Sequence, residues 1–358
     1  MTVTVRSFAK INVGLRIGPA RPDGFHELLT VYQTISLHDV IRLSVARGSG
    51  IEVRCDDPRV PRDKSNTCYR IVEKAMNALS AKGRVVIEIE KRLPVQGGLG
   101  GASANAVATL LALEKALKKS LPAVERLRIA AEVGSDLPLF LVGGMILGVG
   151  RGEQVFPLPD FPAVPCVVVT PEIGVSTPKA FAEWDRLISD AEDVHLTLRK
   201  HIAELRNSLE VRPEGLFPDK KAEMIATERK LTASAPSGRI KKLGYGVSAW
   251  LSEMYSGAPL KRGRAENPLL ALDRAGIEND FEQVVFPEYP ELGEAKRALV
   301  RAGAKYASLS GSGSTLYGLF ASRHAAVAAV NKLQRAGWSA QVTTTLTRTA
   351  YWRGFFKA

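Results

Sequence analysis

The chain has 358 residues, which is enough for one large hydrophobic core or, more readily, for two. Its content of 45% apolar and 24% charged residues is that of an ordinary soluble globular protein. The formal net charge of +12 favours anionic partners, which are nucleic acid, a membrane surface or small phosphorylated substrates, and no basic run is dense enough to select nucleic acid.

The cysteines exclude two further classes. Cys55, Cys68 and Cys166 lie far apart without a Cys-x-x-Cys pair, so neither a disulfide framework nor a zinc site is indicated, and a reducing cytoplasm is the simplest location. The N-terminus lacks the apolar core of a signal peptide, and no apolar run reaches transmembrane length, so we expect no membrane partner.

The chain begins with Thr2 to Ile17, which we predict to form two short strands. Lys10 lies among apolar neighbours there and, in period-2 alternation, shares a face with Asn12. A lysine on a half-buried strand needs an anionic partner or loses its charge. The alternative, a lysine that points to solvent from an edge strand, stays open.

A turn is predicted at Arg21 to His26, where proline and Asp-Gly favour it. It would expose Phe25 and His26, which could stack on and hydrogen-bond to a ring ligand. In the alternative, Phe25 folds into the core beneath a surface loop. Strands over Val31–Leu37 and Val40–Val45 and a helix near Thr67–Lys82 are expected next.

The stretch from Pro94 to Asn105 contains four glycines between a predicted strand, Val85–Lys91, and a predicted helix, Ala104–Leu117. Glycines allow the backbone to approach a ligand with unpaired N–H groups, and a helix N-terminus adds about half a positive charge. Such a loop suits a polyphosphate, although a tight corner without a ligand fits the glycines equally well. It matches neither the Walker loop nor the dinucleotide fingerprint.

Asp136 follows a predicted helix, Leu127–Val133, and precedes the apolar run Leu137 to Phe140. A carboxylate at the edge of an apolar segment needs a cation or hydrogen-bond donors, and Lys10 is the lysine we expect to pair with it. A helix-capping aspartate is the alternative. Strands over Met145–Gly150 and Val164–Thr170 are predicted to follow.

Residues 190–264 form a highly charged segment without a catalytic pattern, which indicates an insertion. It could be a helical appendage, a lid over an anionic substrate, or an oligomer contact such as that of a homodimer. After it we predict helices over Pro290–Ala302 and Arg323–Ala336, a strand over Gln341–Leu346, and a unit resembling a split βαβ domain. The turn in Leu309–Tyr317 could be a flexible hairpin or an anion-binding nest.

The order of these motifs resembles the superfamily of galactokinase, homoserine kinase, mevalonate kinase and phosphomevalonate kinase, the GHMP kinases. Within it, Arg21–Glu27 and Asn279–Glu282 resemble the branch that phosphorylates the 2-hydroxyl of a cytidine-diphosphate-linked methylerythritol in the non-mevalonate isoprenoid route. The resemblance covers about Thr2 to Phe181 and Asn267 to Leu346.

The resemblance implies an α+β protein with two domains and a site in the cleft between them. Residues 1–160 would be an ATP-binding domain of ribosomal-S5-like topology. Residues 161–358 would be a ferredoxin-like domain that carries the insertion. ATP and Mg²⁺ would be the cofactors, and the cytidine diphosphate methylerythritol would be the small-molecule partner.

The resemblance also assigns residues to roles. Lys10 and Asp136 would be catalytic. The nucleotide would lie on a loop of eleven residues, with Ser103 as a Mg²⁺ ligand: Pro94, Val95, Gln96, Gly97, Gly98, Leu99, Gly100, Gly101, Ala102, Ser103 and Ala104. The acceptor substrate would contact six residues: Asn12, Phe25, His26, Phe181, Gly311 and Ser312.

Two departures and two rival functions accompany this assignment. Gln96 and Ala102 stand where the family usually has glycine, and the charged insertion is longer than the usual connection. A sibling kinase of homoserine or mevalonate type is one rival. A catalytically silent nucleotide sensor or nucleic-acid binder, suggested by the positive charge, is the other.

Overall fold

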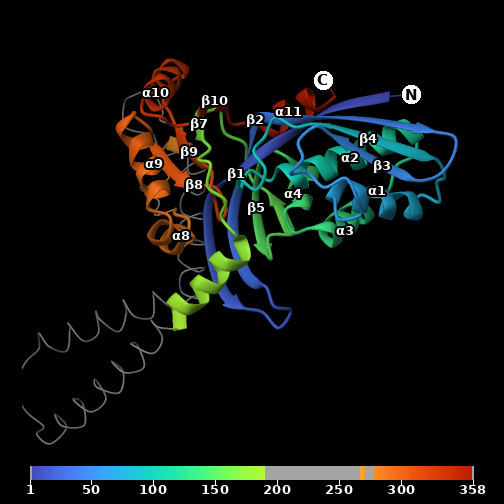
Figure 1. Cartoon of the computed structure of the whole chain (residues 1–358), viewed down its shortest axis with the longest axis horizontal. Coiled ribbons are helices and arrows are strands. Elements are labelled where there is room, and N and C mark those ends of the chain that lie inside the picture. The colour runs from blue at the N-terminus through green and yellow to red at the C-terminus, as the bar shows by residue number, and fades with distance from the viewer. Residues whose placement is uncertain (1, 190–266, 271, 273–276, 357–358) are drawn as a thin grey trace, which may run out of the picture.

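The computed structural model describes residues 2–189, 267–270, 272 and 277–356, which form two β-sheets flanked by helices (Figure 1). The charged insertion predicted at 190–264 lies outside the described residues. Within the described ranges, no helix has both the length and the apolar character needed to cross a membrane.

The first sheet is built around a long antiparallel hairpin of β1 (Thr2–Ala20) and β2 (His26–Ala46). The prediction of separate short strands in these two regions was wrong, because each region is one strand that continues through irregularities in register. Two of these lie between Phe8 and Lys10 and between Asn12 and Gly14. A bulge re-aims nearby side chains, so Lys10 and Asn12 lie between two points where the strand bends.

The other strands of this sheet pair in the order β3-β4-β2-β5-β6, with β1 on β2. Only β3 and β4 run parallel. The predicted strands before the glycine loop and after Asp136 are confirmed. They are β4 (Arg84–Glu90) and β5 (Met145–Gly150), whereas β3 (Ile51–Cys55) and β6 (Gln154–Pro157) were not predicted.

Four helices pack with this sheet, and α2 (Gly101–Leu117) is the central one. Every residue from Ala104 to Leu110 is buried, so α2 is covered on all sides, as expected for a helix that is apolar all round. Its N-terminus therefore points from the middle of the core toward the glycine loop. The other three are α1 (Thr67–Ala78), α3 (Ala123–Val133) and α4 (Leu137–Val142).

The second sheet has the order β10-β7-β9-β8, with every pairing antiparallel. Helices follow β7 and separate β9 from β10, which is the predicted split βαβ arrangement. Its strands are β7 (Pro165–Val169), β8 (Tyr306–Leu309), β9 (Leu316–Leu319) and β10 (Ala340–Thr344). Its helices are α8 (Glu282–Glu288), α9 (Pro290–Arg301), α10 (Arg323–Arg335) and the helix over residues 177–189, with a short 3-10 turn at Pro268–Leu270.

The last helix, α11 (Arg348–Phe355), returns to the first sheet (Figure 1). The Tyr351 hydroxyl donates to the Phe140 carbonyl at 2.7 Å, and the Trp352 indole donates to the Val142 carbonyl at 3.1 Å. The chain therefore begins and ends on the same unit, while the domain division at residue 160 stays a prediction.

The β1–β2 hairpin joins the two sheets. Its buried side chains Ile11, Val13 and Val31 share a core with Cys166 and Tyr317 of the second sheet. The Leu15 amide donates to the Glu278 carbonyl at 2.9 Å, and the Asp280 amide donates back to Leu15 at 2.9 Å. Because β1 carries Lys10 and Asn12, these two residues lie at the junction of the units. The α+β class predicted from the sequence is confirmed.

Candidate active site

Lys10 and Asp136 meet at this junction. The Lys10 side chain is almost fully buried, at 4% exposure, and its Nζ lies 3.5 Å from Asp136 Oδ2. The same Nζ donates to Asn12 Oδ1 at 2.6 Å, and Asn12 in turn donates to Thr30 Oγ1 at 2.8 Å. The lysine thus points inward, which rules out the alternative in which it points to solvent.

Asp136 occupies the N-cap position of α4, but its carboxylate accepts no hydrogen bond from the helix. It faces Lys10 on one oxygen and accepts from the Tyr32 hydroxyl on the other, at 3.1 Å. Its side chain remains 34% exposed. A carboxylate that is held on two sides and still open to solvent can accept a further hydrogen bond from a ligand.

Tyr32 was not predicted as part of the site. It is almost fully buried in β2, and its ring centroid lies 5.6 Å from Lys10 Nζ. A Cβ atom on Gly148 would lie 2.5 Å from this ring, and one on Gly152 would lie 2.4 Å from the hydroxyl. The two glycines therefore make room for Tyr32, and their place after Asp136 was the available signal in the sequence.

Burial shifts the pKa of both ionisable partners of Asp136, Lys10 and Tyr32. It lowers the pKa of Lys10, while the Asp136 carboxylate opposes that shift by favouring the ammonium. Burial, helped by the Asp136 charge, raises the pKa of Tyr32 well above its usual value. The phenol therefore stays protonated at neutral pH and remains a hydrogen-bond donor to Asp136.

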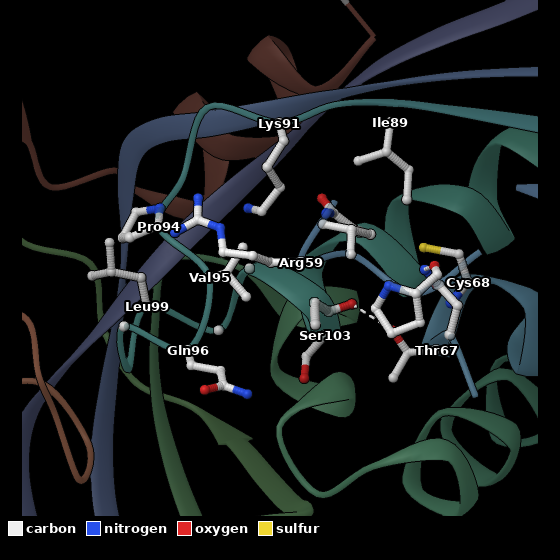
Figure 2. A pocket seen from close by; sticks show the side chains of 18 of the residues that line it. Arg59, Thr67, Cys68, Ile89, Lys91, Pro94, Val95, Gln96, Leu99 and Ser103 are labelled. Carbon is white, nitrogen blue, oxygen red and sulfur yellow. Dashed lines mark hydrogen bonds between the residues drawn. The ribbon is translucent and has the colours of Figure 1, made fainter. Parts of the chain in front are cut away.

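The predicted glycine loop lines a cavity of about 370 Å³ (Figure 2). Pro94, Val95, Gln96 and Leu99 lie on one side of it, and Thr67, Cys68 and Ile89 lie on the other. Ten of the eleven predicted loop residues, Pro94 to Ser103, line the cavity, whereas Ala104 is buried in α2. The rest of the cavity lining was not predicted as part of the site; it includes Arg59, Asn66, Thr67, Cys68, Ile89, Lys91 and Asn105.

The backbone of the loop explains two of its residues. Gly98 has φ +75°, and a Cβ there would lie 2.1 Å from the Ser310 carbonyl, so only glycine fits. Gln96 has φ +57°, a left-handed conformation that favours glycine. This gives a physical reason for the usual glycine at position 96, and it shows that the glutamine adopts the same backbone.

The glycine loop is fastened to the Gly-Ser turn between β8 and β9. Ser310 Oγ donates to the Gly98 carbonyl at 2.9 Å, and the Thr315 amide donates to the Gly97 carbonyl at 3.2 Å. In the same turn, a Cβ on Gly311 would lie 3.6 Å from Lys10 Nζ. The glycine loop and the Gly-Ser turn, which are far apart in the sequence, thereby lie together beside the Lys10–Asp136 pair.

The start of the loop is anchored by Asp39, which the sequence analysis missed. Asp39 is fully buried and accepts from Lys91 Nζ at 2.7 Å and from Asn105 Nδ2 at 2.9 Å. It also accepts from the amides of Arg92 and Leu93, both at 2.7 Å. One carboxylate thus binds the end of β4 to the first turns of α2 and fixes both ends of the loop.

The aromatic residues form a second end of the site. The rings of His26 and Phe181 stack at 4.8 Å and 10°, and His26 Nε2 lies 2.6 Å from Asp185 Oδ1. The two rings are in direct contact, so no base fits between them in this arrangement. Phe25 is 49% exposed, with the Arg151 guanidinium 4.9 Å from its ring centroid, so the alternative with Phe25 in the core is wrong.

Ser312 lies between the two ends. Its hydroxyl lies 2.7 Å from Thr177 Oγ1, which belongs to the first turn of the helix over residues 177–189 that also carries Phe181. Thr177 was not predicted as a site residue. Its sequence context, Ser-Thr-Pro, is typical of a helix start and carries no signal of a ligand contact.

Comparisons with known proteins give this geometry a family context. The family described as GHMP kinases N terminal domain matches residues 66–144, and GHMP kinases C terminal matches residues 260–339. A protein of Solibacter usitatus (strain Ellin6076) named 4-diphosphocytidyl-2-C-methyl-D-erythritol kinase is 36% identical over 92% of this chain and 84% of its own length. A protein of the same name from Synechococcus sp. (strain JA-2-3B'a(2-13)) is 34% identical over 93% of this chain and 89% of its own.

A solved structure agrees with these relatives. The crystal structure of a 4-(cytidine 5'-diphospho)-2C-methyl-D-erythritol kinase is 27% identical, with a TM-score of 0.64, and the match covers 96% of this chain and 98% of that one. The similarity extends over both sheets and confirms the two-domain GHMP kinase fold expected from the sequence.

The Asp39 anchor yields a stability prediction. Asp39→Ala leaves Lys91 buried without its counter-ion and two loop amides without an acceptor, so the free energy of unfolding should fall by about 3–5 kcal/mol in urea denaturation. The matched control is Glu52→Ala on β3, whose carboxylate pairs with Arg54 and Arg84 at an exposed site; it should lose less than about 1 kcal/mol. A similar small loss in both variants would contradict the anchoring role.

Proposed function

The chain belongs to the 4-diphosphocytidyl-2-C-methyl-D-erythritol kinases of the GHMP family, and from that premise we propose that it transfers the γ-phosphoryl group of ATP to the 2-hydroxyl of this cytidine diphosphate substrate. The product would serve isoprenoid precursor synthesis. The observation that carries the proposal is the Lys10–Asp136 pair, which lies between the glycine loop and the aromatic end of the site.

Asp136 is the residue we assign to the acceptor hydroxyl. Its carboxylate would accept the hydroxyl proton as the oxygen bonds to the γ-phosphorus and the bond from that phosphorus to the β-phosphate oxygen breaks. The Tyr32 hydrogen bond and the Lys10 ammonium hold the carboxylate from two sides. The ammonium would also offset negative charge that develops on the attacking oxygen.

ATP would occupy the cavity along the glycine loop, with its phosphates at the N-terminus of α2. The first amides of a helix lack partners within the helix, and the dipole adds positive potential there. Gly100 in the left-handed conformation ends the loop directly before the helix. Phosphoryl transfer through a loose transition state depends mainly on such positioning and charge neutralisation.

Mg²⁺ fits this donor set. Among the described residues no cluster of three or more His, Cys, Asp or Glu side chains could hold a metal ion. Mg²⁺ in kinases is commonly held by substrate phosphates, waters and one or two protein oxygens. Ser103, in the first turn of α2 and on the cavity wall, is the hydroxyl we assign to it. The ion would neutralise phosphate charge.

The cytosine would bind at the aromatic end, where Phe25 offers an exposed ring and Phe181 is held by His26 and Phe281. Asn12, Gly311 and Ser312 would lie toward the diphosphate and the acceptor hydroxyl. Because the His26 and Phe181 rings stack on each other, we propose that the base binds on an outer face of this pair, beside Phe25, rather than between the two rings.

Three further expectations remain proposals. We place the reaction in the cytoplasm, in keeping with three cysteines that are all buried and free. A homodimer and the role of residues 190–264 stay predictions. Of the rival functions, a homoserine or mevalonate kinase is disfavoured by the names of the relatives, and a silent nucleotide sensor or nucleic-acid binder is disfavoured by the intact Lys10–Asp136 pair.

The first test addresses the chemistry. Asp136→Asn removes the proton acceptor but keeps the shape of the side chain, so kcat should fall by about 100-fold or more while ATP still binds. Tyr32→Phe removes only one hydrogen bond to Asp136 and should cost about 10-fold or less. A coupled assay of ADP release with ATP, Mg²⁺ and the cytidine substrate measures both. Near-normal turnover of Asp136→Asn would show that another group accepts the proton.

The second test addresses recognition of the base. Phe181→Ala removes one stacking surface, so KM for the cytidine substrate should rise by the equivalent of about 1–3 kcal/mol, with KM for ATP nearly unchanged. Phe181→Tyr keeps the ring and serves as the matched control, with KM close to the wild-type value. If Phe181→Ala weakened both substrates equally, the ring would act through the core instead of through the base.

A further inference from the structure

Apart from the contact of Phe281 with Phe181, the segment Asn279–Glu282 has no part in the reaction as described so far. It leads into α8 and lies beside β1, where Leu15 forms an isolated bridge with Asn279. Asn279 and Asp280 are almost fully buried, although both are polar. Buried polar side chains usually have specific partners, so we traced the contacts of each residue.

Asn279 holds the Gly-Ser turn. Its Nδ2 donates to the carbonyls of Leu309 and Gly311, both at 2.8 Å, and its Oδ1 accepts from the Phe281 amide at 3.1 Å. These contacts use both amide hydrogens of the side chain. The carboxamide therefore has no free donor for a substrate and acts on the protein backbone.

The turn that Asn279 holds lies against the reacting groups. Gly311 has φ +60°, and a Cβ there would lie 3.5 Å from Asn12 Oδ1 and 3.6 Å from Lys10 Nζ. On its other side the turn is fastened to the glycine loop through Ser310 and Gly98. A shift of the Gly311 carbonyl would therefore move the turn relative to both Lys10 and the nucleotide loop.

The next two residues, Asp280 and Phe281, connect the segment to the aromatic end of the site. Asp280 accepts from Arg16 at 2.6 Å and from the Ile17 amide at 2.9 Å, which ties the segment to the end of β1 before the turn that carries Phe25. Phe281 packs edge-on against Phe181, with ring centroids 5.0 Å apart. The residue two positions after Asn279 thus contacts the Phe181 ring and helps to hold it in place.

We propose that Asn279 is a positioning residue for phosphoryl transfer and that Phe281 is a positioning residue for cytosine recognition. The segment sets the spacing between the two parts of the site that would bind the acceptor substrate, because Asn279 holds the turn beside Lys10 and Phe281, two residues later, holds the Phe181 ring beside His26. This inference rests on the proposed kinase reaction.

The experiment separates the two roles by steady-state kinetics on the full chain. Asn279→Asp keeps the acceptor for the Phe281 amide but places a carboxylate oxygen against the carbonyls of Leu309 and Gly311, so the turn should move. We expect kcat to fall by about 10- to 100-fold, with KM for the cytidine substrate nearly unchanged. Phe281→Leu removes the edge contact and should raise that KM by about 2- to 12-fold, with kcat nearly unchanged. If Asn279→Asp does not fold, Asn279→Ala replaces it with the same expected direction.

Lys296→Met is the matched control. Lys296 contacts Glu282 of the same segment and the Phe286 ring, whose centroid lies 5.9 Å from its Nζ. Since Phe286 is not one of the aromatic rings at the recognition end, Lys296→Met should lower the melting temperature and leave kcat and KM unchanged. A fall in kcat without a change in KM for Asn279→Asp, together with a rise in KM without a change in kcat for Phe281→Leu, supports the proposal. Parallel loss of kcat, substrate affinity and melting temperature in both variants would mean a structural role only and would overturn it. If the wild type is active and Asn279→Asp has normal kinetics, the inference is overturned and the proposed function stands. If the wild type is inactive on the cytidine substrate, both the proposed function and the inference are overturned.

Discussion

The burial of one ammonium group organises this protein. A charge at the position of Lys10 Nζ is costly unless it is paired and hydrogen-bonded, and Asp136 and Asn12 meet that requirement. The aliphatic part of the Lys10 side chain is also closely packed. A Cβ on Gly100 would lie 3.1 Å from Lys10 Cγ, and the Lys10 amide donates to the Leu99 carbonyl at 3.0 Å. The glycine loop is therefore built directly onto the strand that carries the lysine.

Because the loop rests on β1 and the Gly-Ser turn rests on the loop, three distant parts of the chain share one set of contacts. The closest approach is at Gly98, where a Cβ would lie 2.1 Å from the Ser310 carbonyl, and both Gly98 and Gly311 have left-handed backbones that favour glycine. In our proposal the backbone of this loop and the N-terminus of α2 bind the phosphates. The loop itself, from Pro94 to Ala104, contains no basic residue.

The sequence allowed the main parts of this arrangement to be predicted, but not the way in which they are held. Lys10, Asp136 and the glycine loop were predictable because their chemistry has local signals: a lysine in a strand, an acid before an apolar run, and glycines before a helix. The bulges on either side of Lys10, the Tyr32–Asp136 hydrogen bond and the contacts of Asn279 with the Gly-Ser turn depend on residues that are distant in the sequence. Periodicity carries no information on such pairs, which is also why β1 was predicted as two strands. The stacking of His26 on Phe181 likewise follows from the tertiary fold.

Two carboxylates of this site show how burial separates support from chemistry. Asp39 and Asp136 each face a buried lysine, one on either side of the glycine loop. Asp39 is fully buried and accepts from four protein donors, so no lone pair remains for a ligand. Asp136 has Tyr32 on one oxygen and Lys10 near the other, and its side chain is one-third exposed to solvent. A carboxylate can take a proton from a substrate only where an acceptor site stays open, and of these two only Asp136 keeps one. The same ion-pair chemistry therefore serves as an anchor at Asp39 and, in our proposal, as the proton acceptor at Asp136.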